Sequence, residues 1–286
     1  MIDAFNTHRP LLFGIAYRML GRVSEAEDIV QETWLRWSRQ DAAGIQSAKA
    51  WLVSATTRLC IDQMRSARRQ REEYYGVWLP EPLIAAADIQ PDQAAERADS
   101  LTMAFMLMLE SLTPDERAVF LLREVFDYDY PDVAVIVDKT EANCRQIVRR
   151  ARLQLQATPP TPAPPSEQAR RLVEEFIAAA SSGKVDDMLA VLTEDSTVYS
   201  DGGGRVKAAG RAIFGADHVS RFFAGIWPRF MMEMDRRLVD INGRPGLLMS
   251  SQSQIHYAFS FEMAGNRVRG IYIVCNPDKL RHLGPG

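Results

Sequence analysis

The stretch that most constrains this chain is residues 140–156, where one helical face is apolar and the next is cationic. At about 3.6 residues per turn, small and apolar side chains share one side, namely Cys144, Ile147, Val148, Ala151 and Leu155. The adjoining side carries Arg145, Arg149 and Arg152, with Gln146 and Arg150 beside them. A shorter helix is expected over residues 131–137, joined to the basic one by Asp138 and Lys139. The pattern predicts a helix-turn-helix whose second helix enters the major groove of DNA.

The basic face has two interpretations on the sequence alone. Arginine and glutamine form the hydrogen bonds that recognise guanine, adenine and phosphate. The start of the same helix adds Thr140 and Asn143 as candidate DNA contacts. A solvated basic face on an ordinary helix fits the stripe equally well, so the rest of the chain has to decide.

The composition limits how such a chain contacts nucleic acid. With 286 residues, a formal charge of −3 and a pI near 5.9, it suits two or three small domains. Its overall acidity argues against coating nucleic acid through bulk charge, so any DNA contact must come from local basic helices. No apolar run approaches the length of a membrane span, and the N-terminus lacks a signal-peptide pattern. We therefore expect a cytoplasmic protein without membrane contact.

The three cysteines, Cys60, Cys144 and Cys275, are isolated and lack metal-ligand spacing. Each falls on an apolar face, so we expect buried thiols in a reducing compartment. We expect neither a bound metal nor a cofactor.

Prolines divide the chain into structured parts and connections. Residues 76–82 contain two prolines, each of which disfavours helix in the residue before it, and they open a polar connector. Residues 159–165 are proline-rich and form a stiff, extended tether. The predicted parts are all-α domains at 1–75 and 101–157, a connector at 76–100, a linker at 158–165 and a C-terminal domain at 166–286.

The first segment contains a helix with an acidic exposed side. Residues 24–27 (Ser-Glu-Ala-Glu) have the pattern of a capping box, which would start this helix. Its exposed side carries Asp28, Gln31 and Glu32. A second capping box, with proline at the first helical position, is expected at residues 113–116.

A further helix, over residues 48–71, carries a basic stripe. The stripe consists of Arg58, Asp62, Arg65 and Arg69, with Arg68 alongside. It suits a DNA backbone or a melted strand, although Asp62 and Arg65 also fit a simple exposed ion pair. Trp51, at the start of this helix, fits a stacking face for an unpaired base and a plain core position equally well.

The last segment changes from helix to strand. An amphipathic helix is expected over residues 168–180. Strand-like runs follow at residues 196–200, 230–239, 246–250, 255–263 and 267–275. Asn242-Gly243 and Gly265-Asn266 are typical of hairpin turns between such strands. A helix followed by a curled antiparallel sheet predicts an α+β domain with a concave interior.

Residues 1–157 resemble an extracytoplasmic-function sigma factor of bacterial RNA polymerase. Residues 26–35 (Ala-Glu-Asp-Ile-Val-Gln-Glu-Thr-Trp-Leu) are similar to region 2.2 of that family, residues 51–71 to regions 2.3 and 2.4, and residues 113–155 to region 4. The resemblance implies that Asp28, Gln31 and Glu32 meet the clamp helices of the polymerase β′ subunit, and that region 4 meets the flap of β. It also implies that the helix over 51–71 melts and reads the −10 element, and that 140–156 reads the −35 element.

One residue departs from the family pattern. The turn between the paired helices usually has a glycine where this chain has Asp138. Aspartate tolerates the left-handed conformation several-fold better than most residues. We therefore expect the turn to form with aspartate in this position.

Residues 166–286 resemble a SnoaL-like domain, a cone-shaped fold shared with ketosteroid isomerases and nuclear transport factors. Three segments resemble those of a sigma-factor group that carries this domain at the C-terminus: Trp78-Leu79-Pro80-Glu81-Pro82, Asp201-Gly202-Gly203-Gly204-Arg205 and Asn276-Pro277-Asp278-Lys279-Leu280. The resemblance implies that this domain regulates the sigma domains in cis. Glycines at 202–204 permit close approach of the connector backbone, and the alternative is a hairpin loop without a partner.

Two other functions stay open on the sequence alone. Folds of this type host isomerases and cyclases, and the candidate catalytic side chains are Tyr199, Asp201, His218, Asp240 and His256. None lies in a motif that requires chemistry, so we expect no enzyme and favour an unidentified small apolar ligand in the cone. A DNA-binding regulator that acts without polymerase, fused to such a ligand-binding or enzyme domain, is the other alternative. It leaves the acidic helix unexplained.

Overall fold

The computed structural model describes residues 1–40, 44–72, 74–84, 99–155 and 164–284, without the side chains of residues 67–72 and 99. The chain divides into two compact units, Met1–Glu73 with Met108–Pro159 and Tyr74–Leu107 with Pro160–Gly286. The connector therefore belongs to the same unit as the C-terminal domain. The prediction that residues 1–75 and 101–157 are separate domains stays a prediction.

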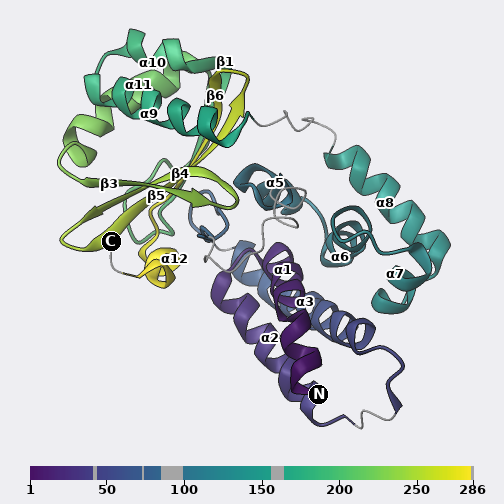
Figure 1. The fold of residues 1–286 in the computed structure, drawn as a ribbon. Coiled ribbons are helices and arrows are strands. Elements are labelled where there is room, and N and C mark those ends of the chain that lie inside the picture. Colours follow the sequence, from purple (N-terminus) through teal and green to yellow (C-terminus); the bar gives the residue numbers. More distant parts are fainter. Residues whose placement is uncertain (41–43, 73, 85–98, 156–163, 285–286) are drawn as a thin grey trace. The chain divides into compact units, whose positions relative to one another are not determined.

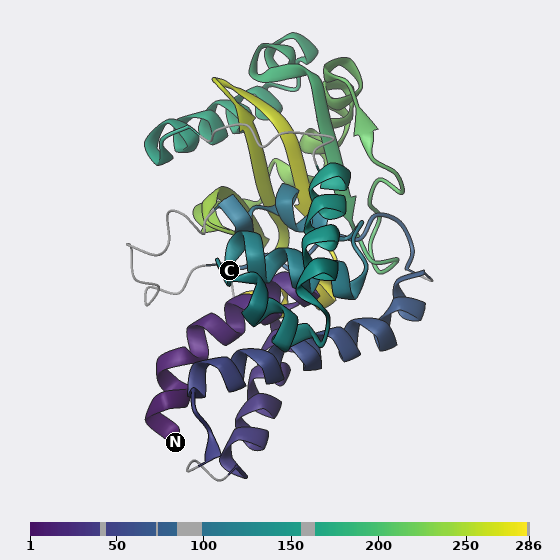
Figure 2. The ribbon, with the colours of Figure 1, turned by 90° about the vertical axis from the view of Figure 1, so that its right-hand side faces the viewer.

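The first unit is built of helices in its described part (Figures 1 and 2). They are α1 (Ile2–Leu20), α2 (Val23–Ser38), α3 (Ala48–Glu72), α6 (Pro114–Phe120), the π-helix η3 (Leu121–Val125), α7 (Tyr130–Val137) and α8 (Glu141–Leu155). α1, α2 and α3 pack against one another through apolar faces with helical spacing. On α2 this face contains Ala26, Ile29 and Val30, all buried, which leaves Asp28 and Gln31 of the acidic side exposed.

One of the two predicted capping boxes is present. At the start of α6 the Thr113 hydroxyl accepts from the Glu116 amide at 3.4 Å, and the Glu116 carboxylate accepts from the Thr113 amide at 3.1 Å. The prediction of a capping box at residues 24–27 was wrong. α2 begins at Val23, so Ser24 already lies inside the first turn. Arg22 precedes the helix, and its Nη1 lies 2.9 Å from Glu25 Oε1.

The helix-turn-helix forms as predicted from α7 and α8. Asp138 occupies the left-handed region with φ 53° and ψ 54°, as expected for a turn that has lost its glycine. The Lys139 amide donates to the Ala134 carbonyl at 3.0 Å and satisfies one of the last acceptors of α7. The inner faces of both helices are buried, with Val133, Ile136 and Val137 on α7 and Cys144, Ile147, Val148 and Ala151 on α8, and the side of α8 that carries the arginines is exposed.

The second unit combines helices with one six-stranded sheet. The helices are α9 (Ser166–Ser182), α10 (Val185–Val191), α11 (Ala216–Ile226), the π-helix η4 (Trp227–Met231), α12 (Pro277–Leu280) and the 3-10 helix η5 (Arg281–Leu283). The strands are β1 (Leu192–Asp201), β2 (Ile213–Phe214), β3 (Asp235–Ile241), β4 (Arg244–Ser251), β5 (Gln254–Ala264) and β6 (Arg267–Val274). The segment Tyr74–Leu107 adds η2 (Asp99–Leu101) and the first part of α5 (Met103–Leu109) to this unit.

The sheet has the strand order β2-β1-β6-β5-β4-β3 and is mixed. Hairpins join β3, β4, β5 and β6, and both predicted turns are present, with Asn242, Gly243 and Gly265 at positive φ. β6 then returns to lie parallel to β1. The expectation of an antiparallel sheet was wrong for this pair, because no hairpin joins β1 to β6: β2, α11 and the strands β3 to β5 lie between them in the chain.

Other elements of this unit differ from the predictions. The strand expected over residues 230–239 begins only at Asp235, because Trp227 and Met231 are buried one helical turn apart and belong to η4. α10 and α11 were not predicted. Within the described chain, none of the helices combines the length and the apolar character that a bilayer span requires.

Each face of the sheet has its own core. α9, α10 and α11 gather on one face, where aromatic rings of Phe176, Phe223, Trp227 and Phe259 fill the interior. On the other face, Leu79 of the connector and Met103 of α5 pack with residues of β3 to β6 and Leu280 of α12. The connector therefore contributes a buried side chain to a hydrophobic core. Exposing this segment to water would cost the free energy gained by that burial.

Candidate nucleic-acid interface and connector site

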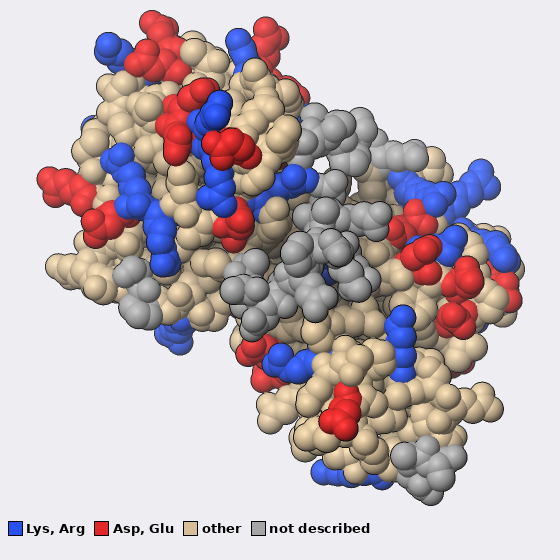
Figure 3. Space-filling model, in the orientation of Figure 1, with Lys and Arg blue, Asp and Glu red and all other residues tan. Residues whose placement is uncertain are grey.

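The basic side of α8 is the first candidate interface with nucleic acid. Arg145, Gln146, Arg149, Arg150 and Arg152 are exposed, while Cys144, Ile147, Val148 and Ala151 are buried. Figure 3 shows blue side chains gathered over α8, with acidic ones beside them. At the start of this helix the Thr140 hydroxyl accepts from the Asn143 amide at 3.3 Å, and Asn143 is exposed.

The four arginines of α8 differ in their intramolecular partners. Arg152 pairs with Glu124 at 2.7 Å, and Arg145 pairs with Glu141 at 3.2 Å. Among the residues that the structure describes, Arg149 and Arg150 form no ion pair. Arg149 and Arg150 can therefore bind an external phosphate or base without breaking an intramolecular ion pair between described residues.

The basic stripe of α3 contacts the helix-turn-helix. Arg58 Nε and Nη2 donate to the carbonyls of Ile136 and Val135, both at 2.9 Å, at the end of α7. Arg65 pairs with Asp115 of α6 at 2.8 Å, and lies 4.0 Å from Asp62. The predicted DNA contacts Arg58 and Arg65 are thus occupied by protein groups here. The side chains of Arg68 and Arg69 lie outside the described residues.

Trp51 and the acidic side of α2 complete the predicted contacts in the first unit. Trp51 is half-buried, and its ring lies 5.3 Å from that of Trp37. Asp28 and Gln31 are exposed, while Glu32 is half-buried and pairs with Arg36 at 2.8 Å. Two of the three side chains predicted to meet polymerase are therefore open to solvent.

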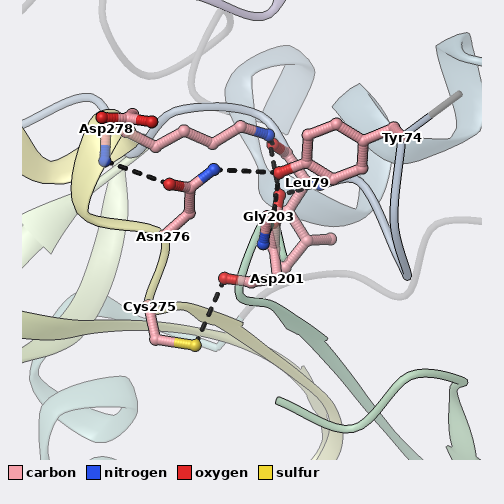
Figure 4. A network of polar contacts seen from close by, with 8 residues as sticks. Tyr74, Leu79, Asp201, Gly203, Cys275, Asn276 and Asp278 are labelled. Carbon is pink, nitrogen blue, oxygen red and sulfur yellow. Dashed lines mark hydrogen bonds and ion pairs between the residues drawn. The ribbon is translucent and has the colours of Figure 1, made fainter. Parts of the chain in front are cut away.

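A second candidate site lies where the connector meets the C-terminal domain (Figure 4). We call this group the connector site, and it consists of Tyr74, Leu79, Asp201, Asn276 and Lys279. Asp201 ends β1, Asn276 begins the turn into α12, and Lys279 lies on α12. Tyr74 lies just before the connector and Leu79 lies within it, so the site joins segments far apart in the sequence.

The carboxylate of Asp201 is at the centre of the connector site. Its Oδ1 accepts from the Tyr74 hydroxyl at 2.5 Å and the Gly203 amide at 3.0 Å. Its Oδ2 accepts from the Leu79 amide at 2.8 Å and Lys279 Nζ at 2.7 Å. Four donors therefore satisfy a carboxylate that is fully buried.

Lys279 is the cation of this site and its side chain is also fully buried. Besides Asp201, its ammonium group donates to the Leu79 carbonyl. The ammonium nitrogen lies 4.2 Å from the ring centroid of Trp78 and 5.0 Å from that of Tyr74, within reach of cation–π attraction. Removing either charge would leave the other buried without its partner, which is costly.

Other contacts hold the same segments together. The amide of Asn276 donates through Nδ2 to the Tyr74 hydroxyl at 3.0 Å, and Arg205 pairs with Asp278 at 3.2 Å. Glu81 and Pro82 are buried, and the Pro82 carbonyl lies 2.8 Å from His282 Nε2. The segments predicted to regulate between domains are thus brought together in the second unit.

Comparison with known proteins decides the family. Residues 4–70 match the family model of Sigma-70 region 2, and residues 102–155 match that of Sigma-70 region 4. The chain is 33% identical over 290 residues to the ECF RNA polymerase sigma factor SigJ of Mycobacterium tuberculosis, covering 98% of this chain and 93% of that protein. The chain belongs to the ECF RNA polymerase sigma factors. It is therefore a factor of promoter-specific transcription initiation.

The similarity extends through the C-terminal domain. The probable ECF RNA polymerase sigma factor SigI of the same species is 28% identical over 282 residues, covering 98% of this chain and 94% of that protein. The crystal structure of M. tuberculosis SigJ has a TM-score of 0.79 at 30% identity, covering 98% of both chains. The α+β domain is thus part of the fold that this sigma factor has in common with SigJ.

The candidate catalytic side chains of the sigma factor have separate surroundings. Asp201 belongs to the connector site, Asp240 pairs with Arg170 at 2.8 Å, and the His218 ring is exposed beside the Phe214 carbonyl. Tyr199 stacks on Tyr272 with ring centroids 5.5 Å apart. Burial raises the pKa of both phenols, with the charge of Glu262 adding to it. His256 is half-buried on β5.

The cysteines of this sigma factor are buried and free, as predicted. Burial raises the pKa of the Cys275 thiol to about 12, and the charge of Asp201 adds to the shift. The thiols of Cys60 and Cys144 also have raised pKa values, mainly through burial. Within the described ranges, no three His, Cys, Asp or Glu side chains are grouped as metal ligands.

Two residues whose hydrogen bonds join the segment Tyr74–Leu107 to the C-terminal domain were not predicted to do so. Tyr74, one residue inside the predicted first domain, donates to Asp201. Asn242 was identified only as a turn residue, yet its amide group accepts from the Leu83 amide at 3.0 Å and donates to the Leu101 carbonyl at 2.9 Å. A tyrosine just before a connector that contains prolines is only a weak indication of a contact with a distant segment. An asparagine in a turn gives no indication of such a contact.

Proposed function

We propose that this chain binds core RNA polymerase, selects promoters by their −10 and −35 elements, and performs no catalysis of its own. It would act in the cytoplasm, where transcription takes place. The observation that carries the proposal is the helix-turn-helix of α7 and α8, with its exposed arginines, inside the segment that matches Sigma-70 region 4.

The helices divide the work of recognition in this proposal. Thr140, Asn143, Arg145, Gln146, Arg149, Arg150 and Arg152 of α8 contact the −35 element. Trp51, Arg58, Asp62, Arg65, Arg68 and Arg69 of α3 contact the −10 element. Asp28, Gln31 and Glu32 of α2 meet the clamp helices of β′, and the segment of region 4 meets the flap of β.

Access to α3 requires a change in the first unit. While Arg58 donates to the Ile136 carbonyl and Arg65 to Asp115, part of each guanidinium is withheld from a DNA strand. Both contacts are half-exposed or exposed hydrogen bonds, which water and phosphate replace at a cost of about 1 kcal/mol each. Polymerase binding would provide the free energy to break these two contacts and free the arginines.

The C-terminal domain regulates this process through the connector site. The chain leaves the first unit after α3 and returns to it at Met108, and the intervening segment belongs to the second unit. The buried pair Asp201–Lys279 and its bonds to Leu79 support a fixed connector, and hence a defined path between the two DNA-reading segments. An unidentified small ligand bound in this domain would act through the same connector.

Transcription with core polymerase and the full-length chain tests the proposed function. The template is a promoter library with randomised −35 and −10 regions, and the readout is the set of enriched start sites. Enrichment should require the protein, and Arg149→Ala should reduce it most at −35-dependent starts. A helix-turn-helix regulator without polymerase would bind the duplexes but neither bind core polymerase nor produce starts.

Variants of α2 separate polymerase binding from DNA binding. Asp28→Lys with Glu32→Lys should abolish the complex with core polymerase while leaving binding to the bare promoter duplex unchanged. The matched control is Glu167→Lys in α9, an exposed acid of the other unit. Unchanged polymerase binding by the α2 variant would remove the assignment of this surface.

A further inference from the structure

Tyr130, the first residue of α7, is contacted by two guanidinium groups. The guanidinium carbon of Arg123 lies 5.1 Å from the centre of its ring, and that of Arg145 lies 4.8 Å from it. Both distances are within the range of cation–π attraction. Arg123 belongs to η3 and Arg145 to α8, so one ring connects both helices of the helix-turn-helix with the segment before them.

Arg123 holds the loop that positions this ring. Its Nη1 donates to the Tyr128 carbonyl at 3.0 Å and lies 3.6 Å from Asp127 and 3.5 Å from Asp129. Asp127 has a left-handed backbone, with φ 54°. The three contacts span residues 127–129, and Tyr130 follows directly.

Arg145 forms an ion pair within its own helix, and more than half of its side chain is exposed to solvent. Its Nη2 lies 3.2 Å from the Glu141 carboxylate one turn earlier, and 56% of its side chain is exposed. A guanidinium binds guanine or phosphate through two parallel hydrogen bonds, so its orientation decides whether both can form. Contact with an aromatic face fixes that orientation in a way a lysine ammonium cannot.

We infer that Tyr130 is a positioning residue that orients the Arg145 guanidinium for a specific contact with the −35 element. The inference rests on the proposed function, since it requires α8 to enter promoter DNA. The Tyr130 hydroxyl need not touch the DNA. Its ring restricts the rotamers of Arg145 before binding, so less conformational entropy is lost when the contact forms.

Binding measurements with the full-length chain and core polymerase test this role. The probe is the duplex most enriched by the wild-type protein from a library with a randomised −35 region, together with its single-base variants. Tyr130→Leu should weaken binding about threefold, the worth of a cation–π contact at a partly exposed site. It should also reduce the preference for one base of the −35 element. Tyr130→Phe should restore both values.

A double-mutant cycle isolates the coupling. In an Arg145→Ala background, Tyr130→Leu should have no further effect, because the ring then has no guanidinium to orient. In an Arg149→Ala background the two losses should multiply, since Arg149 has no ring contact among the described residues. Multiplying losses with Arg145→Ala would overturn the inference, as would a phenylalanine variant that behaves like the leucine variant.

Arg145→Lys tests the inference without touching the fold of α7. It keeps the charge and removes the planar group, so it should lose the same base preference while nonspecific binding is kept. An unchanged base preference in this variant would overturn the inference. If the wild-type chain enriches no duplex at all, the proposed function fails, and that result is visible before any variant is made.

Discussion

Gly203 shows why the connector site requires a glycine at one position. Its backbone has φ +57°, and a Cβ atom there would lie 2.1 Å from Asn276 Nδ2 and 3.0 Å from the Tyr74 hydroxyl. Asn276 is itself held between Tyr74 and the Asp278 amide, so it has little room to move. The neighbours of Gly203 are thus the side chains of Asn276 and Tyr74, and not the connector backbone that was expected to approach the glycine triplet.

Gly203→Ala should therefore loosen the connector. A left-handed alanine costs about 1–2 kcal/mol before the clash with Asn276 is counted. Hydrogen exchange of residues 74–84 should become faster, and the urea midpoint of the second unit should fall. The matched control is Gly210→Ala, where an added Cβ meets no atom within 4 Å. Equal exchange rates in the two variants would contradict the role of Gly203.

At the scale of elements, buried and half-buried charges connect helices of the first unit. Arg117, at 1% exposure, donates to the carbonyls of Leu109 at 3.0 Å and Met19 at 2.8 Å, and pairs with Glu110. It thus satisfies acceptors at the ends of α5 and α1. Asp115 in the same helix lies between Arg65 and Lys139, 2.8 Å and 3.0 Å away.

Arg117→Met should destabilise the first unit by about 3 kcal/mol, because two carbonyls and a carboxylate lose their donor in a buried place. Chemical denaturation of the full chain, followed by the tryptophans of α2 and α3, measures this. Arg36→Met serves as control, since its pair with Glu32 is about half-exposed and should contribute little. A loss as small as that of the control would show that Arg117 is dispensable.

The contacts of Asp115 should make the free energy of unfolding depend on pH. Burial acts to raise the pKa of Asp115, but hydrogen bonds and charges from Arg65 and Lys139 lower it overall. Because the folded pKa lies below the unfolded value of about 4, the stabilisation is present above about pH 4 and is lost as pH falls through the folded pKa.

The difference in unfolding free energy between wild type and Asp115→Asn should therefore shrink as pH is lowered from about 5 to about 3. Equilibrium urea titrations at several pH values measure it. Asp62→Asn, at an exposed acid 4.0 Å from Arg65, should show a small difference throughout. A difference for Asp115→Asn that stays constant with pH would contradict this account.

Elements with strong periodicity were predictable from the sequence, and their partners were not. The two faces of α8 and the turn at Asp138 follow from spacing and backbone preference. The contacts of Arg117 depend on which carbonyls the fold brings near, so its burial has no local signal. The predicted strand at residues 230–239 starts too early, because apolar residues such as Phe230 and Met231 favour strands until burial at helical spacing decides otherwise.

At the scale of the whole molecule, we propose that the two DNA-reading segments of this sigma factor are joined through a connector fixed by its C-terminal domain. The buried pair Asp201–Lys279 is the strongest link in that connection. Lys279→Met leaves the Asp201 carboxylate buried without its cation, whereas Asp201→Leu with Lys279→Met removes both charges. Only the single variant should incur the cost of an unpaired buried charge, about 3–5 kcal/mol.

Run-off transcription with core polymerase on an enriched promoter tests this claim most directly. We predict starts that depend on the wild-type chain and a changed start frequency for Lys279→Met, accompanied by faster hydrogen exchange in residues 74–84. Starts at the wild-type frequency from a variant whose connector is demonstrably released would contradict regulation through this site. No starts with the wild-type chain on any enriched promoter would contradict the account as a whole.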